Sequence, residues 1–385
     1  MTVERTEIRV LALIATETVS GPGRQLAAVA GALLQKGVRV EVGVLHRSEC
    51  VSSPFVEFLR AQDVPVHLIP DAGPLDLDVV RSVRRLRHET GAHILQTHSY
   101  KATAAAWMLR RRHPALPWIG FYHGHTTETM RARFYHWLDR RMLRSANTIV
   151  VMSTKQRETF ERNGAHATVV YNAVVPLPEG TSDRAVPPVV PRLGVIGRLS
   201  PEKGVDVFLE ACALLRTSGM AFHALIVGDG PEHGRLAELA ERLDLADVVT
   251  FPGRLDVTQA LYAELDLVII PSRTEGLPNV LLEAIGSGVS VVSTRVGAVP
   301  DVLAGSNAGS MVPPEDPAAL AHAIRQMLER RHDGDVRRDQ EQLRRRFSLQ
   351  TRAEAHVALY RSLLEAAGES SRPVTRDSAG TRVVQ

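Results

Sequence analysis

Two glutamates, Glu275 and Glu283, stand on either side of a seven-residue segment in the second half of the chain. The surrounding sequence, residues 268–284, reads VIIPSRTEGLPNVLLEA. Its apolar start predicts a buried strand, and the helix-forming run at residues 279–285 predicts a helix after a polar loop. A carboxylate accepts hydrogen bonds from two neighbouring hydroxyl groups, such as those of a sugar ring or a ribose. These residues therefore indicate a site for a sugar-containing ligand.

The loop between the two glutamates has the features of a phosphate site. The first turn of a helix has unpaired backbone N–H groups and the positive end of the helix dipole. Pro278 suits an early helical position, because its missing N–H would have no partner there. We expect phosphate to bind at five residues, Gly276, Leu277, Pro278, Asn279 and Val280. The alternative is an ordinary helix start with two exposed acids.

Two basic residues follow another apolar run, residues 193–197, in the segment GRLSPEKG. Arg198 is expected in a loop and Lys203 at the start of a helix. A lysine there opposes the helix dipole unless an anion offsets it, and a departing diphosphate needs such cations. The alternative is an exposed Lys203 that pairs with Glu202 or Asp206.

Histidines mark the ends of two expected strands in the first half. The segment FYHGHT contains His123 and His125, and His98 ends the preceding strand. No cysteine or third close histidine completes a zinc-like set, so no metal is expected here. A neutral imidazole can instead form a hydrogen bond with a hydroxyl group.

Two glycine-containing turns also follow expected strands. Gly21 and Gly23 would let the backbone approach a ligand closely, although an ordinary tight turn would have the same composition. Asp229 and Gly230 belong to the turn GDGPEHG, which differs from the dinucleotide fingerprint G-x-G-x-x-G by one residue. The pair Asp76 and Asp78 resembles a metal-binding acid pair, but helix capping explains it as well.

Alternating strands and helices extend through both halves of the chain and would position these residues. In the first half, strands are expected at residues 8–14, 38–44, 66–69, 94–97, 118–122, 148–152 and 168–171, and helices at 25–35, 77–88, 103–112 and 127–144. In the second half, strands are expected at residues 193–197, 224–228, 248–251, 267–270 and 290–293, and helices at 205–215, 231–242, 257–263 and 279–285. This alternation predicts the α/β class, with two doubly wound parallel sheets that bind ligands at the carboxyl ends of their strands.

The length of 385 residues suits two domains. We expect a first domain at residues 1–173, a proline-rich linker at 174–191 and a second domain at 192–348. A final helix is expected at residues 349–367. The polar residues 368–385 are expected to form a disordered tail.

Several of these segments together resemble family 4 of the glycosyltransferases. The resemblance covers about residues 8–365, and it is carried most specifically by the two glutamates and by the segment GAVPDVL at residues 297–303. It implies the GT-B fold, in which two Rossmann-like domains face each other across a cleft and the C-terminal helix crosses back to the first domain. It also implies that the second domain binds a UDP- or GDP-linked sugar and the first domain an acceptor. Transfer would retain the anomeric configuration and use no metal or cofactor.

The resemblance gives individual residues a role. The first glutamate of the motif would contact the donor sugar and the second the ribose, while the two basic residues would hold the diphosphate. His123 matches a histidine beside the donor sugar better than His125 does, and His98 remains its alternative. The expected catalytic residues are His123, Arg198, Lys203 and Glu275. The expected donor-binding residues are Gly21, Gly23, Arg198, Lys203, Asp229, Gly230, Glu275, Gly276, Leu277, Pro278, Asn279, Val280 and Glu283. Asp301 stands where family members often have glutamate.

Charge and composition bear on partners and location. Residues 1–172 hold 23 Lys and Arg against 15 Asp and Glu, whereas the whole chain has a net charge of only +3. The expected helix at residues 127–144 combines arginines with aromatic residues, which suits anionic lipids or lipid diphosphates but also an ordinary packed helix. The two cysteines, Cys50 and Cys212, are far apart, and the first apolar run is too short for a signal peptide. We expect a cytoplasmic protein, with peripheral contact to the membrane and a lipid-linked or saccharide acceptor.

Other functions share parts of this pattern. A sugar phosphorylase, a nucleotide-sugar epimerase or a non-catalytic nucleotide-sugar-binding protein could have the same fold. A small soluble acceptor is an alternative to a lipid-linked one. The incomplete fingerprint disfavours a NAD-dependent oxidoreductase, and the dispersed basic residues disfavour nucleic acid binding. The function that we expect is transfer of a sugar in the assembly of a cell-surface polysaccharide or glycolipid.

Overall fold

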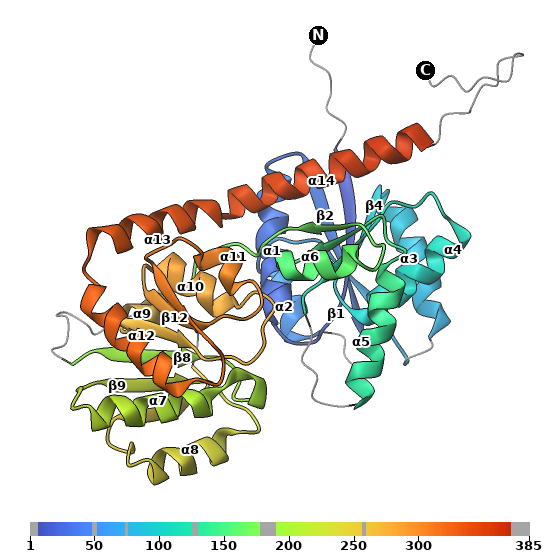
Figure 1. Cartoon of the computed structure of the whole chain (residues 1–385). Helices are drawn as coiled ribbons and strands as arrows, with labels where there is room; N and C mark the ends of the chain where they lie inside the picture. The colour runs from blue at the N-terminus through green and yellow to red at the C-terminus, as the bar shows by residue number, and fades with distance from the viewer. Residues whose placement is uncertain are drawn as a thin grey trace, which may run out of the picture.

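Two parallel sheets organise the chain in the computed structural model (Figure 1). The structure describes residues 7–47, 52–73, 76–124, 130–177, 190–255 and 259–370, although the side chains of residues 130–133, 369 and 370 are not included in this description. His125, Cys50, most of the expected linker and residues 371–385 of the expected tail therefore lie outside the described residues.

The first sheet has seven strands in the order β3-β2-β1-β4-β5-β6-β7. Its strands are β1 (Ile8–Ala15), β2 (Val38–His46), β3 (Val66–Pro70), β4 (Ile94–Thr97), β5 (Trp118–Tyr122), β6 (Thr148–Val151) and β7 (Ala167–Val169). The helices between them are α1 (Gly21–Leu34), α2 (Pro54–Arg60), α3 (Leu77–Thr90), α4 (Tyr100–Arg112), α5 (Met130–Leu143) and α6 (Thr154–Glu161). All neighbouring strands are parallel, as the alternation predicts.

Both faces of the first sheet are covered, because side chains alternate along each strand. Val10 and Ala12 of β1 pack into the core beneath α1 and α2. Leu11 and Leu13 of the same strand face the core beneath α3 and α4. Burial of both faces explains the nearly continuous apolar sequence of β1.

The second sheet has six strands in the order β10-β9-β8-β11-β12-β13. Its strands are β8 (Arg192–Ile196), β9 (His223–Val227), β10 (Val249–Gly253), β11 (Leu267–Ile270), β12 (Ser290–Thr294) and β13 (Gly309–Val312). The intervening elements are the 3₁₀ turn η1 (Pro201–Lys203) and the helices α7 (Val205–Thr217), α8 (His233–Arg242), α9 (Gln259–Ala263), α10 (Asn279–Ser287), α11 (Val299–Leu303) and α12 (Pro317–Arg330). In each sheet the strand order reverses next to the first strand, which places ligands at the carboxyl ends of the strands on either side.

Two helices end the described chain, α13 (Gly334–Arg346) and α14 (Leu349–Ser370). In Figure 1 they run along one side of the molecule from the second domain to the first, where α14 packs against α1. Lys36, just after α1, forms an ion pair with Glu354 of α14 at 3.2 Å. Residues 368–370 continue α14, so the expected tail was placed too early.

The start of α1 differs from the prediction. The helix begins at Gly21 rather than near Gln25, because the side chain of Ser20 accepts the backbone N–H of Gly23 and Pro22 occupies the first turn. The two glycines expected in a loop are therefore helical. Asp76, by contrast, caps α3 by accepting the N–H of Asp78, as the capping interpretation predicts.

Candidate active site

A small cavity of about 240 Å³ lies at the carboxyl edge of the second sheet. The loops after β8 and β11 and the first turn of α10 form its walls. Seven of the residues proposed from the sequence line it: Arg198, Lys203, Glu275, Leu277, Pro278, Asn279 and Val280. The fold thus brings together two segments that are about seventy residues apart in the chain.

Lys203 and Glu275 are in direct contact at this cavity. The Lys203 Nζ atom donates to Glu275 Oε1 at 2.6 Å, and Ser272 Oγ donates to the same oxygen at 2.8 Å. Neither Glu202 nor Asp206 is the partner of Lys203, so the alternative pairing expected from the sequence is wrong. An ammonium group has three donors, so Lys203 can hold this carboxylate and a second anion together.

Arg273 fixes the loop that carries Lys203. Its guanidinium forms two hydrogen bonds with the Asp206 carboxylate, at 2.9 and 3.1 Å, and donates to the Pro201 carbonyl at 2.6 Å. Burial by itself raises the pKa of Asp206. The hydrogen bonds and charge of Arg273, together with hydrogen bonds from Arg235 and the Val207 backbone, outweigh burial, and the net shift of the pKa is downward. The bidentate contact therefore binds an ionised Asp206 and holds the start of α7 against the loop after β11.

The first turn of α10 lies at the domain interface. The helix begins at Asn279, as predicted, and Pro278 is its N-cap with an extended backbone rather than a residue of the first helical turn. A methyl group on Gly276 would lie 2.4 Å from the carbonyl oxygen of His123 in the first domain. Only glycine permits so close an approach. The backbone of Glu275 and Gly276 in the second domain therefore lies directly against the end of β5 in the first domain.

Glu283 lies on the same helix but in a more enclosed environment. Its carboxylate accepts a hydrogen bond from the hydroxyl of Tyr262 at 2.7 Å, and the charge of Arg24 acts on it from α1. Burial raises the pKa of Glu283 despite both of these contacts, and burial likewise raises the pKa of Tyr262. Glu283 is therefore an acceptor next to the first domain.

His123 is joined to α14 through a chain of polar groups. Tyr360 of α14 donates its hydroxyl to Gln96 Oε1 at 2.7 Å, and Gln96 Nε2 lies 2.6 Å from His98 Nε2. His98 Nδ1 then lies 3.1 Å from His123 Nε2. Phe121 stacks on the His98 ring at a centroid distance of 4.4 Å and holds it in place. The order in the chain is thus Tyr360, Gln96, His98 and His123.

The donor and the acceptor of each hydrogen bond in this series of polar groups can be assigned by starting from Tyr360. The Tyr360 hydroxyl occupies the carbonyl oxygen of Gln96, so the Gln96 amide nitrogen must donate to His98 Nε2. Burial, and then the charge of His123, lowers the pKa of His98 well below its usual value, which keeps the ring neutral. Its proton lies on Nδ1 and is donated to His123 Nε2. A neutral His123 then has its own proton on Nδ1, where it is a hydrogen-bond donor.

The predicted residues outside the cavity have other surroundings. A side chain on Gly21 would meet Asn279 Nδ2 at 2.3 Å, so α1 touches the start of α10. A side chain on Gly23 would meet the ring of Phe55, which gives Gly23 a packing role. Gly230 packs against the Leu199 carbonyl, and the backbone of Asp229 accepts the Leu199 N–H at 2.9 Å. The Asp229–Gly230 turn therefore supports the loop of Arg198.

Sequence reasoning missed the residues that support the site. Tyr262, Arg273 and Tyr360 act through partners distant in sequence. Ser272 and Gln96 contact the nearby Glu275 and His98, but no local motif marks them. Asp301, noted from the sequence only because family members often have glutamate there, joins the domains. It accepts the Thr154 N–H at 2.7 Å and the Tyr171 hydroxyl at 3.2 Å. In the described part of the chain, no group of three His, Cys, Asp or Glu residues could hold a metal ion.

Comparison with known proteins identifies two family matches. Residues 20–178 match the model of the glycosyl transferase 4-like domain, and residues 190–330 match that of glycosyl transferases group 1. The D-inositol 3-phosphate glycosyltransferase of Corynebacterium urealyticum is 28% identical in an alignment 373 residues long, which covers 86% of this chain and 84% of that protein. The putative colanic acid biosynthesis glycosyltransferase WcaL of Salmonella typhimurium is 35% identical over 146 residues, only 36% of each chain.

Solved structures share the fold. The sucrose-phosphate synthase of Thermosynechococcus elongatus superposes with a TM-score of 0.76 at 20% identity, over 93% of this chain and all of that one. HepE of Anabaena in complex with UDP gives a TM-score of 0.75 at 20% identity, over 92% of this chain and all of that one. These likenesses confirm the expected two-domain GT-B architecture.

Proposed function

We propose the following reaction for this chain, which belongs to the family 4 glycosyltransferases: transfer of a sugar from a nucleoside diphosphate to an acceptor hydroxyl, with retention of configuration. The observation that carries the proposal is the contact between Lys203 and Glu275 at the first turn of α10. A diphosphate at this turn would meet backbone N–H groups, Arg198 and Lys203 together. These groups would stabilise the charge that develops on the leaving diphosphate.

The sugar would lie between the two domains. Glu275 would accept hydrogen bonds from its hydroxyls, and the Nδ1–H of His123 would donate to another. In a retaining transfer the acceptor attacks from the side of the leaving group, so an oxygen of the departing diphosphate can take the acceptor proton. The new glycosidic bond then replaces the bond to phosphate, and the nucleoside diphosphate leaves. The basic residues supply the positive charge for this step, so we propose that no metal is needed.

The nucleoside would lie beyond the phosphates, with its ribose at Glu283. We propose a UDP-linked donor first and a GDP-linked donor second, because HepE, with the same fold, is known in complex with UDP. The ionised carboxylate of Glu283 can accept from both ribose hydroxyls. Burial near Arg24 and Tyr262 holds it in one orientation.

Binding of bare nucleotides tests the donor site separately from catalysis. Thermal unfolding would be followed with UDP, GDP and ADP in parallel, since a ligand at about a hundred times its Kd adds roughly 2.7 kcal/mol of stability. Glu283→Ala should abolish most of the shift, whereas Glu275→Ala should preserve it and reduce sugar transfer. Wild-type turnover in both variants, or no shift with any nucleotide, would refute this assignment.

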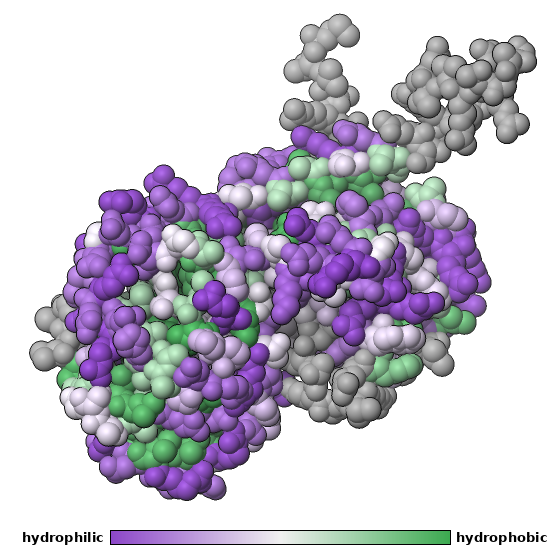
Figure 2. Space-filling model, viewed as in Figure 1, coloured by the Kyte–Doolittle hydropathy of each residue, from purple (hydrophilic) through white to green (hydrophobic). Residues whose placement is uncertain are grey.

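For the acceptor, we propose a lipid-linked saccharide or lipid phosphate in cell-surface polysaccharide or glycolipid assembly. WcaL, named for colanic acid biosynthesis, supports the polysaccharide part of the proposal. None of the described helices has both the length and the hydrophobicity that crossing a bilayer requires. Contact with the cytoplasmic face of the membrane would be peripheral, through the basic first domain. Hydrophilic side chains cover most of the face in Figure 2, and hydrophobic ones gather in smaller patches.

Vesicle sedimentation tests membrane contact. The protein would be mixed with vesicles of phosphatidylglycerol at low and high salt, and with vesicles of phosphatidylcholine as a control. Binding only to the anionic vesicles, and only at low salt, is expected because electrostatic attraction is screened by salt. Absence of binding at low salt would favour a small soluble acceptor.

A further inference from the structure

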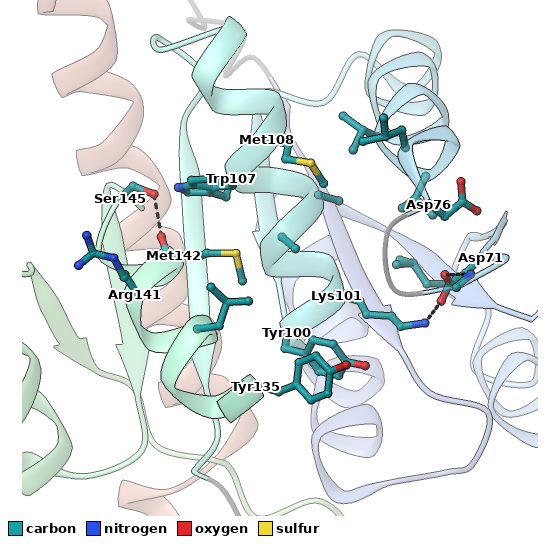
Figure 3. Close-up of a pocket in the computed structure, with 18 of the residues that line it drawn as sticks. Asp71, Asp76, Tyr100, Lys101, Trp107, Met108, Tyr135, Arg141, Met142 and Ser145 are labelled. Carbon is teal, nitrogen blue, oxygen red and sulfur yellow. Dashed lines mark hydrogen bonds and ion pairs between the residues drawn. The ribbon is translucent and has the colours of Figure 1, made fainter. Parts of the chain in front are cut away.

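A second and larger cavity, of about 890 Å³, lies in the first domain between α3, α4 and α5 (Figure 3). Its walls are mainly hydrophobic and are formed by Val79 and Val80 of α3, Ala105 and Met108 of α4, and Leu138 and Met142 of α5. Cavities of this size with apolar walls and a few polar groups are typical of small-molecule sites. It is separate from the donor cavity, which lies in the second domain.

One end of this cavity is polar and lies at the carboxyl edge of the first sheet. Asp71 follows β3, and Tyr100 and Lys101 begin α4 just after His98. Lys101 forms an ion pair with Asp71, and Figure 3 shows this pair beside the stacked rings of Tyr100 and Tyr135, whose centroids are 5.2 Å apart. Because β3, β4 and β5 are parallel members of one sheet, this end and His123 lie along the same edge.

The other end lies near the end of α5 and carries arginines. Arg141 and Arg144 line the cavity there, and neither forms an ion pair with a described residue. The two acids of the cavity, Asp71 and Asp76, are already engaged, the first by Lys101 and the second by the backbone N–H groups of Ala72 and Asp78. The charge left without a partner in the described structure is therefore positive.

Large hydrophobic side chains are also exposed around this cavity. Leu77, Tyr100 and Trp137 line it, and the ring of Phe134 stacks on Trp137 at 6.1 Å. Their exposed fractions are 60% for Leu77, 38% for Tyr100, 54% for Trp137 and 58% for Phe134. Exposed apolar clusters mark binding sites, and aromatic residues beside arginines suit the surface of an anionic bilayer.

We propose that this cavity binds the hydrocarbon chain of the acceptor. The occupant is an alkyl or isoprenoid chain joined through a phosphate to the group that is glycosylated. The chain lies between α4 and α5, its phosphate is close to Lys101, and the acceptor hydroxyl extends along the sheet edge toward His123. Arg141 and Arg144 contact the anionic surface from which the chain is drawn. This inference rests on the proposed transferase function, since it names the acceptor of that reaction.

Tryptophan fluorescence can detect the chain inside the cavity. Dodecyl phosphate with two bromine atoms near the chain end, used below its micelle concentration, quenches a tryptophan on contact. Trp107 and Trp137 both line the cavity, whereas Trp118 is fully buried in the core. We expect saturable quenching that Trp107→Phe combined with Trp137→Phe largely removes. Brominated butyl phosphate, which has the same head group and a short chain, should quench at least tenfold more weakly.

A filled cavity provides the decisive variant. Ala104→Phe places a ring inside the cavity, and Ala237→Phe is the matched control on α8 of the other domain. The first variant should weaken quenching by about tenfold or more, and the second should leave it unchanged. Equal quenching in wild type and Ala104→Phe, or equal quenching by the butyl compound, would overturn the proposal. UDP should stabilise Ala104→Phe as it does wild type, which shows that the variant is folded.

The two proposals fail in different ways. If UDP does not raise the unfolding temperature of wild type but quenching is observed, the transferase site is refuted and the chain-binding cavity remains. If UDP raises the unfolding temperature but no quenching is observed, the cavity proposal is refuted and the transferase site remains.

Arg141→Gln combined with Arg144→Gln should reduce sedimentation with phosphatidylglycerol vesicles by at least half. Unchanged sedimentation of that variant would overturn the part assigned to the two arginines.

Discussion

Replacing Gln96 with glutamate should reverse the hydrogen bond between His98 and His123. The native amide nitrogen donates to His98 Nε2, whereas an ionised carboxylate can only accept. In Gln96→Glu, His98 must donate from Nε2, and its Nδ1 must accept from His123 Nε2. His123 then has a lone pair rather than a proton on Nδ1. Residue 96 does not line the donor cavity, yet its replacement changes which nitrogen of His123, the proposed catalytic histidine, can donate a hydrogen bond.

The size of the effect follows from the single contact that is lost. The Tyr360 hydroxyl can still donate to the new carboxylate, so the buried groups of the chain keep their partners. What is lost is the proposed hydrogen bond from His123 to a sugar hydroxyl, which leaves a desolvated partner unsatisfied at a cost of about 1–3 kcal/mol. This corresponds to a roughly 5- to 150-fold fall in kcat/KM.

Two measurements and one matched control test the reasoning. Long-range proton–nitrogen NMR of the histidine rings reports the protonated nitrogen of His123 directly, and kcat/KM reports its consequence. Tyr360→Phe removes a hydrogen bond from the same chain but leaves the Gln96 amide free to donate, so its kcat/KM should remain near that of wild type. An unchanged His123 tautomer in Gln96→Glu, or an equal loss of activity in Tyr360→Phe, would refute the assignment.

Further predictions concern the metal, the interface and pH. Activity should survive EDTA, and full loss in EDTA with recovery on adding magnesium or manganese would contradict a metal-free mechanism. Gly276→Ala should lower kcat about tenfold or more by forcing the domains apart. Gly31→Ala, with open space around it, should have no such effect, and equal kcat values for the two variants would contradict this prediction. UDP affinity should fall as the pH is lowered through the raised pKa of Glu283, and Glu283→Gln should lose that dependence in calorimetric titrations. Burial lowers the pKa of His356 to about 3 in the folded protein, so the unfolded chain takes up a proton at a higher pH than the folded one. The free energy of unfolding, measured with urea, should therefore fall by up to ~1.4 kcal/mol per pH unit below about pH 6.5, and by less in His356→Phe.

Local patterns were sufficient to predict much of the fold. Each expected strand has a counterpart in the structure, because strands buried on both faces read as continuous apolar runs. Strand ends and the first turn of α10 also predicted which segments meet, and Lys203 and Glu275 do meet. The start of α1 was missed because the capping by Ser20 was not considered.

The supporting contacts could not be predicted in the same way. Tyr262 reaches Glu283 from α9, and Tyr360 reaches Gln96 across 264 positions in the sequence. Such pairs depend on how helices pack on the sheets, and a single sequence has no local signal for that. The partner of Lys203 was equally ambiguous, since two acids were nearer in sequence than Glu275.

The position of α14 has a consequence for folding during synthesis. Ala353, Val357, Tyr360 and Leu363 of this helix belong to the same hydrophobic core as Leu26 and Phe121 of the first domain. Domains generally fold as they emerge from the ribosome, starting with the N-terminal one. Here the first domain is made first, but part of its core is made last, after the whole second domain. The second domain can therefore complete its packing earlier, and nascent chains that stop before Leu349 should carry an open apolar face along α1.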